Sequence, residues 1–209
     1  MSRWQEWHVD YDDPRSTLAR RLHVVRKLLG RALDTTPPGP VQLLSLCAGQ
    51  ARDVLGVVPN HPRRDDVRGR LVELDPANAA VARDGLQDAG LDEIDVVVAD
   101  AGTTDSACGV VPADVVLLCG IFGNIAESDI ERTIRAAPML CAGGATVLWT
   151  RHRRQPDLIA SIVDWFAAAG FVEVEVVKLA ASLSTVGSHR LAVPPQAFEP
   201  GRRLFSFIR

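Results

Sequence analysis

An apolar run that ends in a turn of small residues constrains the fold of this chain more than any other feature. Residues 41–47 have the composition of a buried strand, and the turn at 47–51 (Cys-Ala-Gly-Gln-Ala) follows without a spacer. A helix-like segment begins directly afterwards. Small residues between a strand and a helix let the polar atoms of a ligand approach the backbone closely. This arrangement is typical of the mouth of a nucleotide- or nucleoside-binding α/β sheet.

The rest of the chain alternates between predicted strands and predicted helices. We expect strands at residues 41–47, 70–74, 94–99, 113–119, 145–150 and 171–179, and a last strand at 188–193 or 203–208. We expect helices at residues 14–33, 51–58, 76–88, 128 onward and 156–169. This alternation predicts a mostly parallel sheet covered by helices on both faces. Two closing strands with no helix between them predict an antiparallel edge pair.

The N-terminal part is predicted to be an extension of the main domain. Apolar residues recur at helical spacing from Leu18 to Leu33, and Asp13-Pro14 is a favourable N-cap and first helical pair. The proline-rich linker before residue 41 then stops the helix. We therefore divide the chain into an aromatic segment with an amphipathic helix at 1–38 and a main domain at 39–209. A second N-cap is expected at Ser128, in a capping box with Glu131.

Composition limits the classes of function. The chain has 209 residues, 47% of them hydrophobic, which suits one globular domain with a sizeable core. Its net charge of -3 argues against a nucleic-acid partner, and it has neither a signal-peptide pattern nor an apolar stretch long enough for a bilayer. The four cysteines show no CxxC spacing, so we expect reduced thiols in a cytoplasmic protein. No metal-binding motif is present in the sequence.

Two acidic residues follow predicted strands at the edge where such sheets bind ligands. Asp75 can accept hydrogen bonds from ribose hydroxyls, but Asp75-Pro76 is also an ideal start for a helix. Asp100 can accept from an adenine amino group, or it is a turn residue before Gly102. The stretch from Cys119 to Gly123 either walls a cofactor or is an ordinary strand end.

Together these segments resemble the class I S-adenosylmethionine-dependent methyltransferases over residues 41–208. Residues 44–51 are similar to the glycine-rich first motif of that family, and residues 72–75 to its ribose-binding acidic motif. Residues 96–101 resemble the adenine-contacting segment, and residues 113–120 the fourth motif. The sequence departs from the first motif in three places. Ser45 replaces an acidic residue, and Cys47 and Ala51 replace glycines.

The resemblance implies a Rossmann-like, mostly parallel seven-stranded sheet with helices on both faces, an antiparallel last strand and an N-terminal helical extension. It implies S-adenosylmethionine as cofactor and methyl transfer to an oxygen or nitrogen of a small molecule by in-line displacement. Because Ser45 is not acidic, contact to the cofactor's amino group must come from backbone carbonyls or from another residue. The expected cofactor-binding residues are Cys47, Ala48, Gly49, Gln50, Asp75, Pro76, Asp100, Ala101, Cys119, Gly120 and Phe122.

Candidates for catalysis and acceptor binding are less well defined. A hydroxyl acceptor needs a base to remove its proton. His152 is the first candidate because it follows the fifth strand at the ligand edge, and His189 and Tyr11 come next. Arginines can bind a carboxylate or phosphate of the acceptor, or they can be solvated loop residues. The expected substrate-binding residues are Trp7, Asn124, Arg151 and Arg190.

Two other interpretations stay open. A nicotinamide-dependent oxidoreductase shares the strand, the turn and the acidic residue, but it normally carries G-x-G-x-x-G, and here the third small position is missing. A methyltransferase-like module without catalytic activity is the second alternative. We make no prediction of the oligomeric state.

Overall fold

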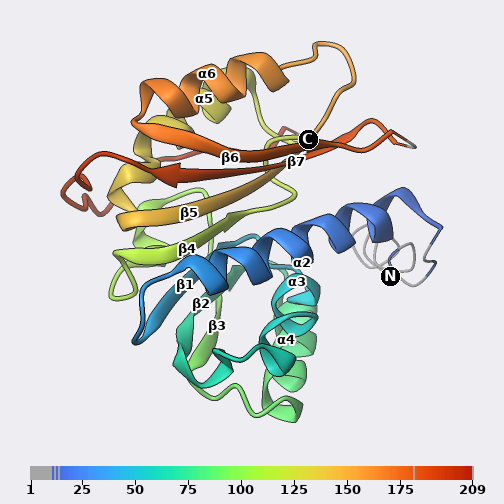
Figure 1. The fold of residues 1–209 in the computed structure, drawn as a ribbon, viewed down its shortest axis with the longest axis vertical. Helices are drawn as coiled ribbons and strands as arrows, with labels where there is room; N and C mark the ends of the chain where they lie inside the picture. Colours follow the sequence, from blue (N-terminus) through green and yellow to red (C-terminus); the bar gives the residue numbers. More distant parts are fainter. Residues whose placement is uncertain (1–10, 12, 14, 181, 209) are drawn as a thin grey trace.

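A seven-stranded sheet forms the centre of the molecule (Figure 1). The computed structural model describes residues 11, 13, 15–180 and 182–208. The strands are β1 (Val41–Leu46), β2 (Val67–Glu73), β3 (Ile94–Val98), β4 (Ala113–Leu118), β5 (Cys141–His152), β6 (Phe171–Lys178) and β7 (Ser184–Leu191). Their order is β3-β2-β1-β4-β5-β7-β6, with β7 antiparallel to both of its neighbours and the pairs from β3 to β5 parallel. The predicted Rossmann-like fold with an antiparallel last strand is confirmed.

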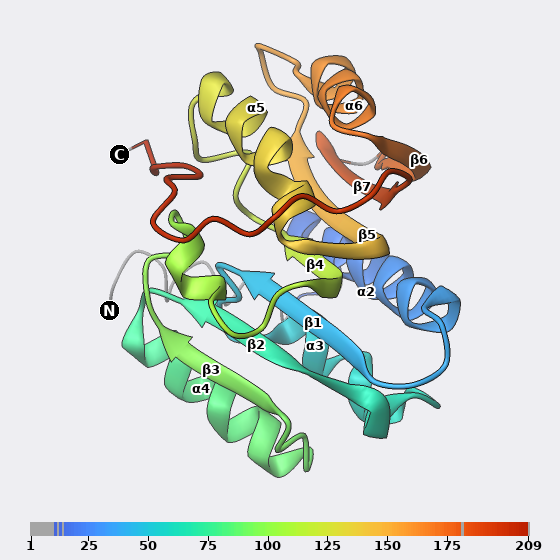
Figure 2. The same cartoon turned by 90° about the vertical axis from the view of Figure 1, so that its left-hand side faces the viewer.

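Helices cover both faces of the sheet (Figures 1 and 2). One face carries α2 (Thr17–Thr35), α3 (Arg52–Leu55) and α4 (Pro76–Asp88), and the other carries α5 (Glu127–Ala136) and α6 (Ile159–Ala168). Short 3-10 turns are η1 (Val58–Asn60), η2 (Arg64–Asp66), η3 (Thr104–Ala107) and η4 (Ala137–Met139). None of the helices in the described part of the chain is long and apolar enough to cross a membrane.

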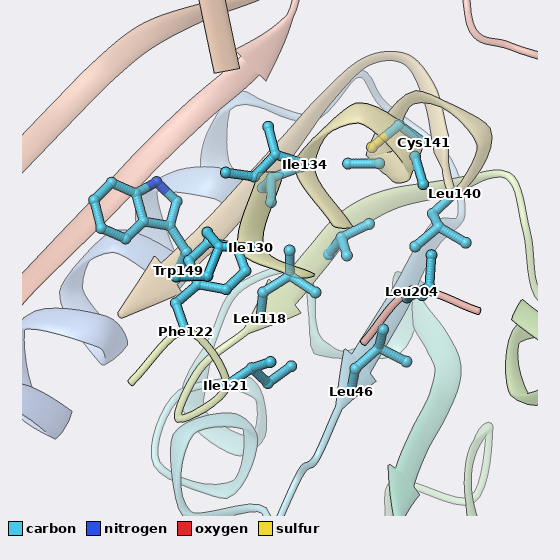
Figure 3. Close-up of a cluster of buried hydrophobic side chains, with 14 of the residues drawn as sticks. Leu46, Leu118, Ile121, Phe122, Ile130, Ile134, Leu140, Cys141, Trp149 and Leu204 are labelled. Carbon is cyan, nitrogen blue, oxygen red and sulfur yellow. The ribbon is translucent and has the colours of Figure 1, made fainter. Parts of the chain in front are cut away.

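The sheet separates two apolar cores. On the α5 and α6 face, Trp149 of β5 lies between Phe122 and Phe166, with ring centroids 6.1 Å away in both cases (Figure 3 shows Trp149 and Phe122). On the opposite face, the apolar stripe of α2 packs against β5, β7 and α3 through buried residues such as Leu29 and Leu33. The N-terminal helix therefore shares a core with the sheet, because its stripe recurs at the 3.6-residue helical period.

Two of the predicted helix starts are wrong, whereas the start predicted at Asp75-Pro76 is confirmed. Helix α2 begins at Thr17, and the Ser16 hydroxyl accepts a hydrogen bond from the Ala19 amide at 2.9 Å, so Ser16 rather than Asp13 is the N-cap. Pro14 lies outside the described residues. Helix α5 begins at Glu127 after Ala126, which has no side-chain acceptor, so the capping box at Ser128 does not form.

The strand boundaries differ from the predictions mainly near the C-terminus. Strand β7 begins at Ser184, four positions before the predicted start at 188, and β5 extends from Cys141 to His152 on both sides of the predicted range. Residues 203–208 form only isolated bridges within the described chain. This C-terminal segment runs along the carboxyl edge of the sheet, where the Leu204 amide donates to the Gly102 carbonyl at 2.8 Å (Figure 2).

Candidate functional site

A cleft with a volume of about 470 Å³ opens at the carboxyl edge of the sheet. The ends of β1, β2 and β4 and the segment after β3 form its floor, and α2 contributes the opposite wall. This volume lies within the ~300–1,000 Å³ range of small-molecule sites. The lining residues are Tyr11, Arg21, Leu22, Val25, Cys47, Ala48, Gly49, Gln50, Arg52, Asp53, Glu73, Leu74, Asp75, Pro76, Asn78, Asp100, Ala101, Cys119, Gly120, Thr150 and Phe207.

The turn after β1 adopts a left-handed backbone at three alternate positions. Cys47, Gly49 and Ala51 have φ angles of 59°, 57° and 56°. Residues with a Cβ adopt this conformation at a cost of about 1–2 kcal/mol each. The turn therefore keeps the backbone path for which glycines are suited, although only one of the three residues is a glycine. Its small side chains leave the cleft open at this point.

Glu73, the last residue of β2, anchors the turn and faces the cleft. One carboxylate oxygen accepts from the Gly49 amide at 2.7 Å, and the other accepts from the Asp75 amide at 2.9 Å. Glu73 is not among the predicted site residues, because the pattern of an acidic residue before a helix points to Asp75, two residues later. Asp75 caps α4: its Oδ1 accepts from the amides of Ala77 and Asn78 at 2.8 and 3.3 Å. Glu73 is therefore the better placed acceptor for a diol.

Asp100 lies at the β3 side of the cleft and is engaged by protein groups. Its Oδ1 accepts from the Gly102 amide at 2.8 Å, and its Oδ2 pairs with Arg203 at 2.7 Å. The C-terminal segment thus reaches this edge, and Phe207 lines the cleft there. Asp100 serves as the turn residue that the sequence allowed, and a ligand amino group would share its oxygens with Arg203.

The β4 side of the cleft combines thiols with charged groups from α2 and α3. Burial raises the pKa of the Cys47 and Cys119 thiols, so both are neutral, apolar wall residues rather than nucleophiles. Asp53 is only 8% exposed, and burial raises the pKa of its carboxyl, an effect that the positive charges of Arg26 and Arg21 oppose. Thr150 also lines the cleft on this side, and its hydroxyl accepts from the Gly120 amide at 2.8 Å.

Tyr11 lies at the cleft, held by two arginines. The Arg21 Nη2 donates to the Tyr11 hydroxyl at 2.9 Å, and the Arg52 guanidinium carbon lies 5.5 Å from the centroid of the tyrosine ring. Tyr11 is thus the one predicted catalytic residue that lines the cleft, and its role stays a prediction. Trp7, predicted to contact the substrate, lies outside the described residues.

His189 is not at the cleft, so the structure does not support its predicted catalytic role. It is 1% exposed in the core beneath α6, where its ring stacks on Phe166 with centroids 4.4 Å apart. Its Nδ1 accepts from the indole Nε1 of Trp149 at 3.1 Å, and burial lowers its pKa to about 4. Arg190 is exposed and pairs in register with Thr146, six residues before the carboxyl end of β5, so the structure does not support its predicted contact with a substrate.

Three further predicted residues belong to the packing between β4 and β5. Phe122 is fully buried in the core and does not line the cleft (Figure 3). Arg151 is buried, and its guanidinium donates to the Phe122 carbonyl inside the protein. Asn124 donates to the Gly120 carbonyl at 2.7 Å. The predicted ligand contacts of all three are not supported, because none of these residues lines the cleft.

His152 lies at the end of β5 but outside the cleft lining. Its ring is next to Gly123: a Cβ at that glycine would lie 3.3 Å from the histidine Cδ2. Burial, followed by the charge of Arg151, lowers the pKa of His152. A neutral imidazole at this place can accept a proton, and the predicted catalytic role of His152 stays a prediction.

The sheet order, the antiparallel β7 and a cleft across the strand ends define the fold of the class I S-adenosylmethionine-dependent methyltransferases. No protein-family model and no curated protein sequence matches the chain. Solved structures do match, at identities that show the fold alone. A possible exported protein from Bordetella parapertussis is 16% identical with a TM-score of 0.67, over 83% of this chain and 68% of that chain.

Methyltransferases predominate among the matched structures whose names give an activity. An O-methyltransferase family protein from Burkholderia thailandensis is 17% identical with a TM-score of 0.63, over 88% of this chain and 57% of that chain. An RNA methyltransferase from Salinibacter ruber, in complex with S-adenosyl-L-homocysteine, is 18% identical with a TM-score of 0.52, over 83% and 97% of the two chains.

Proposed function

We propose that the protein is an S-adenosylmethionine-dependent methyltransferase that methylates an oxygen or nitrogen of a small molecule. The observation that carries this proposal is the cleft in which the turn after β1, Glu73 and the segment after β3 line one space. These are a backbone turn of small residues, a diol acceptor and an apolar wall. Such a set is complementary to an adenosine group.

The residues that line the cleft fit the ribose, the adenine ring and the amino-acid end of the cofactor. The Glu73 carboxylate, already fixed by two amides, would accept hydrogen bonds from the ribose hydroxyls. Leu74, Pro76 and Ala101 offer apolar surface to the adenine ring. Backbone groups at Ala48 and Gly49 would face the polar atoms between the sugar and the amino-acid end. Bound S-adenosylmethionine supplies an electrophilic methyl group.

The chain's own contribution to catalysis is then mainly positioning. Holding an acceptor in line with the methyl group supplies a large part of the acceleration. The α2 residues Leu22 and Val25 add apolar surface to the cleft lining. The Tyr11 hydroxyl, beside the Arg21 cation, would orient the acceptor through a hydrogen bond.

The size of the cleft and the charge of the chain support a small molecule as the acceptor. Residues of α2 and Tyr11 line a cleft of about 470 Å³, a size that favours a small molecule over a macromolecule. The net charge of -3 supports the same choice, because nucleic-acid binders are usually basic. All four cysteines are unpaired, which supports the proposed cytoplasmic location.

Calorimetry with two cofactor classes tests the proposal. We expect the protein to bind S-adenosylmethionine and S-adenosylhomocysteine, and NAD and NADP not at all. Formation of S-adenosylhomocysteine from S-adenosylmethionine with a panel of small hydroxyl and amino compounds then tests turnover. Binding of NAD in place of the methyl donor would establish the oxidoreductase alternative. Tight donor binding with no turnover on any acceptor would favour the non-catalytic module.

A further inference from the structure

Two opposite charges line the β4 side of the cleft without contacting each other. Asp53 comes from α3 and Arg21 from α2, and both border the cleft. The Asp53 Oδ1 accepts from the Val54 amide at 2.9 Å. The backbone amide of Asp53 also bonds to this carboxylate, but among the described residues no side chain donates to it and no ion pair with Arg21 or Arg26 forms. Asp53 is nevertheless more than nine-tenths buried.

A buried carboxylate without an ionic partner is costly unless something compensates its charge. The nearby arginines are engaged elsewhere: Arg26 donates to the Arg52 carbonyl at 2.6 and 3.0 Å, and Arg21 donates to Tyr11. Their fields oppose the effect of burial on Asp53 without neutralising it by contact. The Asp53 carboxylate is therefore suited to bind a cation that enters through the cleft.

The other acidic residues of the cleft already have partners within the protein. Glu73 accepts from two amides, Asp75 caps α4, and Asp100 binds Gly102 and Arg203. Ser45, where an acidic residue is usual in the resembling family, is buried within β1 and does not line the cleft. The second oxygen of Asp75 also has no donor among the described residues, but Asp53 is the more deeply buried of these two carboxylates.

Asp53 and Arg21 lie near the end of β4, whereas the proposed adenosine contacts come from the ends of β2 and β3. Both charges act on the Cys119 thiol after β4, whereas Glu73 and Asp100 act on Cys47 after β1. Strands β3 and β4 stand on opposite sides of β1 and β2 in the sheet order. A ligand with adenosine near Glu73 therefore extends toward Asp53 and Arg21.

We propose that Asp53 and Arg21 form a subsite for an α-amino acid zwitterion, namely the methionine end of the cofactor. Asp53 binds the ammonium group, and Arg21 binds the carboxylate with donors that Tyr11 leaves free. The acidic group absent at position 45 is thereby supplied from α3. This inference rests on the proposed function, and it assigns the recognition of the amino-acid end to two side chains.

Three ligands separate the two halves of the subsite. S-Adenosylhomocysteine carries both charges, its decarboxylated form keeps only the ammonium group, and 5′-methylthioadenosine carries neither. In calorimetric titrations, we expect Asp53→Asn to weaken binding of the first two by about 10- to 100-fold, the effect of one charged hydrogen bond. Arg21→Gln should weaken only S-adenosylhomocysteine by a similar factor. Neither variant should change the affinity for methylthioadenosine.

A neighbouring arginine and the melting temperature control for structural damage. Arg20 of the same helix is exposed and does not line the cleft, so Arg20→Gln should leave all three affinities unchanged. Unchanged S-adenosylhomocysteine binding by both cleft variants, or equal loss for methylthioadenosine, overturns the subsite. If the unaltered protein binds neither S-adenosylhomocysteine nor methylthioadenosine, the proposed function itself is overturned.

Discussion

The two ends of the sheet use polar residues in opposite ways. Around β1 to β4, carboxylates such as Glu73 and Asp53 are fixed by backbone amides and border an open cleft. Around β5 to β7, His189 and Arg151 bond to Trp149 and to a backbone carbonyl inside the core. A polar side chain near the ligand edge therefore indicates a site only if the surrounding fold places it at the cleft. Each end accordingly makes distinct predictions for stability and for binding.

The largest expected effect concerns the packed end. A Cβ at Gly187 of β7 would lie 2.2 Å from Cε2 of Trp149, which is buried among aromatic rings. We expect Gly187→Ala to lower the free energy of unfolding by about 3 kcal/mol, because the overpacked ring cannot move without disturbing the core. Urea unfolding measures this loss, and the affinity of the folded fraction for S-adenosylhomocysteine should stay unchanged.

Gly143 of β5 provides the matched control for Gly187. A Cβ at Gly143 would have no neighbour within 4 Å, so Gly143→Ala should change stability by less than about 0.5 kcal/mol. Equal effects at the two glycines would show that the β5–β7 contact is not closely packed.

The second prediction is a pH dependence that originates at His189. Burial lowers the pKa of His189 to about 4, whereas the unfolded chain should titrate near 6.5. Between these values the unfolded state binds more protons, so stability is complete above pH 6.5 and falls as the pH decreases toward 4. The loss should amount to about 3 kcal/mol.

A variant without a titratable group isolates this effect. His189→Gln keeps an acceptor for the Trp149 indole but cannot be protonated. Urea unfolding at pH 7.5 and pH 4.5 should show a smaller acid-induced loss in the variant than in the unaltered protein, because the other titrating groups are common to both. Parallel pH profiles would contradict the burial of His189 as a neutral ring.

The contrast between the ends also explains which features the sequence could predict. Strand and helix alternation predicted the sheet and its ligand edge, because hydrophobic periodicity is a local signal. The burial of His189 depends on the register of β7 against β5, which no local pattern determines. Glu73 was missed because two acidic residues flank Leu74, and periodicity alone does not place the last residue of a strand within two positions.

The third prediction concerns ligand affinity at the cleft end of the sheet. Glu73→Gln removes the charge that would face the ribose, and we expect the Kd of S-adenosylhomocysteine to rise by about 30-fold, or ~2 kcal/mol. Asp75→Asn removes a charge two residues away but preserves a good N-cap. It should change the Kd by less than about threefold.

Calorimetry on both variants, with melting temperatures as the control for folding, decides between the two carboxylates. If Asp75→Asn loses affinity and Glu73→Gln does not, the original interpretation of Asp75 as the ribose acceptor holds and the assignment from the structure is wrong.

The smallest expected effect lies in the turn that opens the cleft. Ala51 is fully buried with a φ of 56°, whereas Ala79 is fully buried inside helix α4. Ala79→Gly should cost about 1 kcal/mol, since glycine is a poor helix former. Ala51→Gly incurs a similar entropic cost but relieves left-handed strain of about 1–2 kcal/mol, so stability should change by less than about 0.5 kcal/mol. Equal losses for the two substitutions in urea unfolding would mean that the left-handed backbone at Ala51 is not strained.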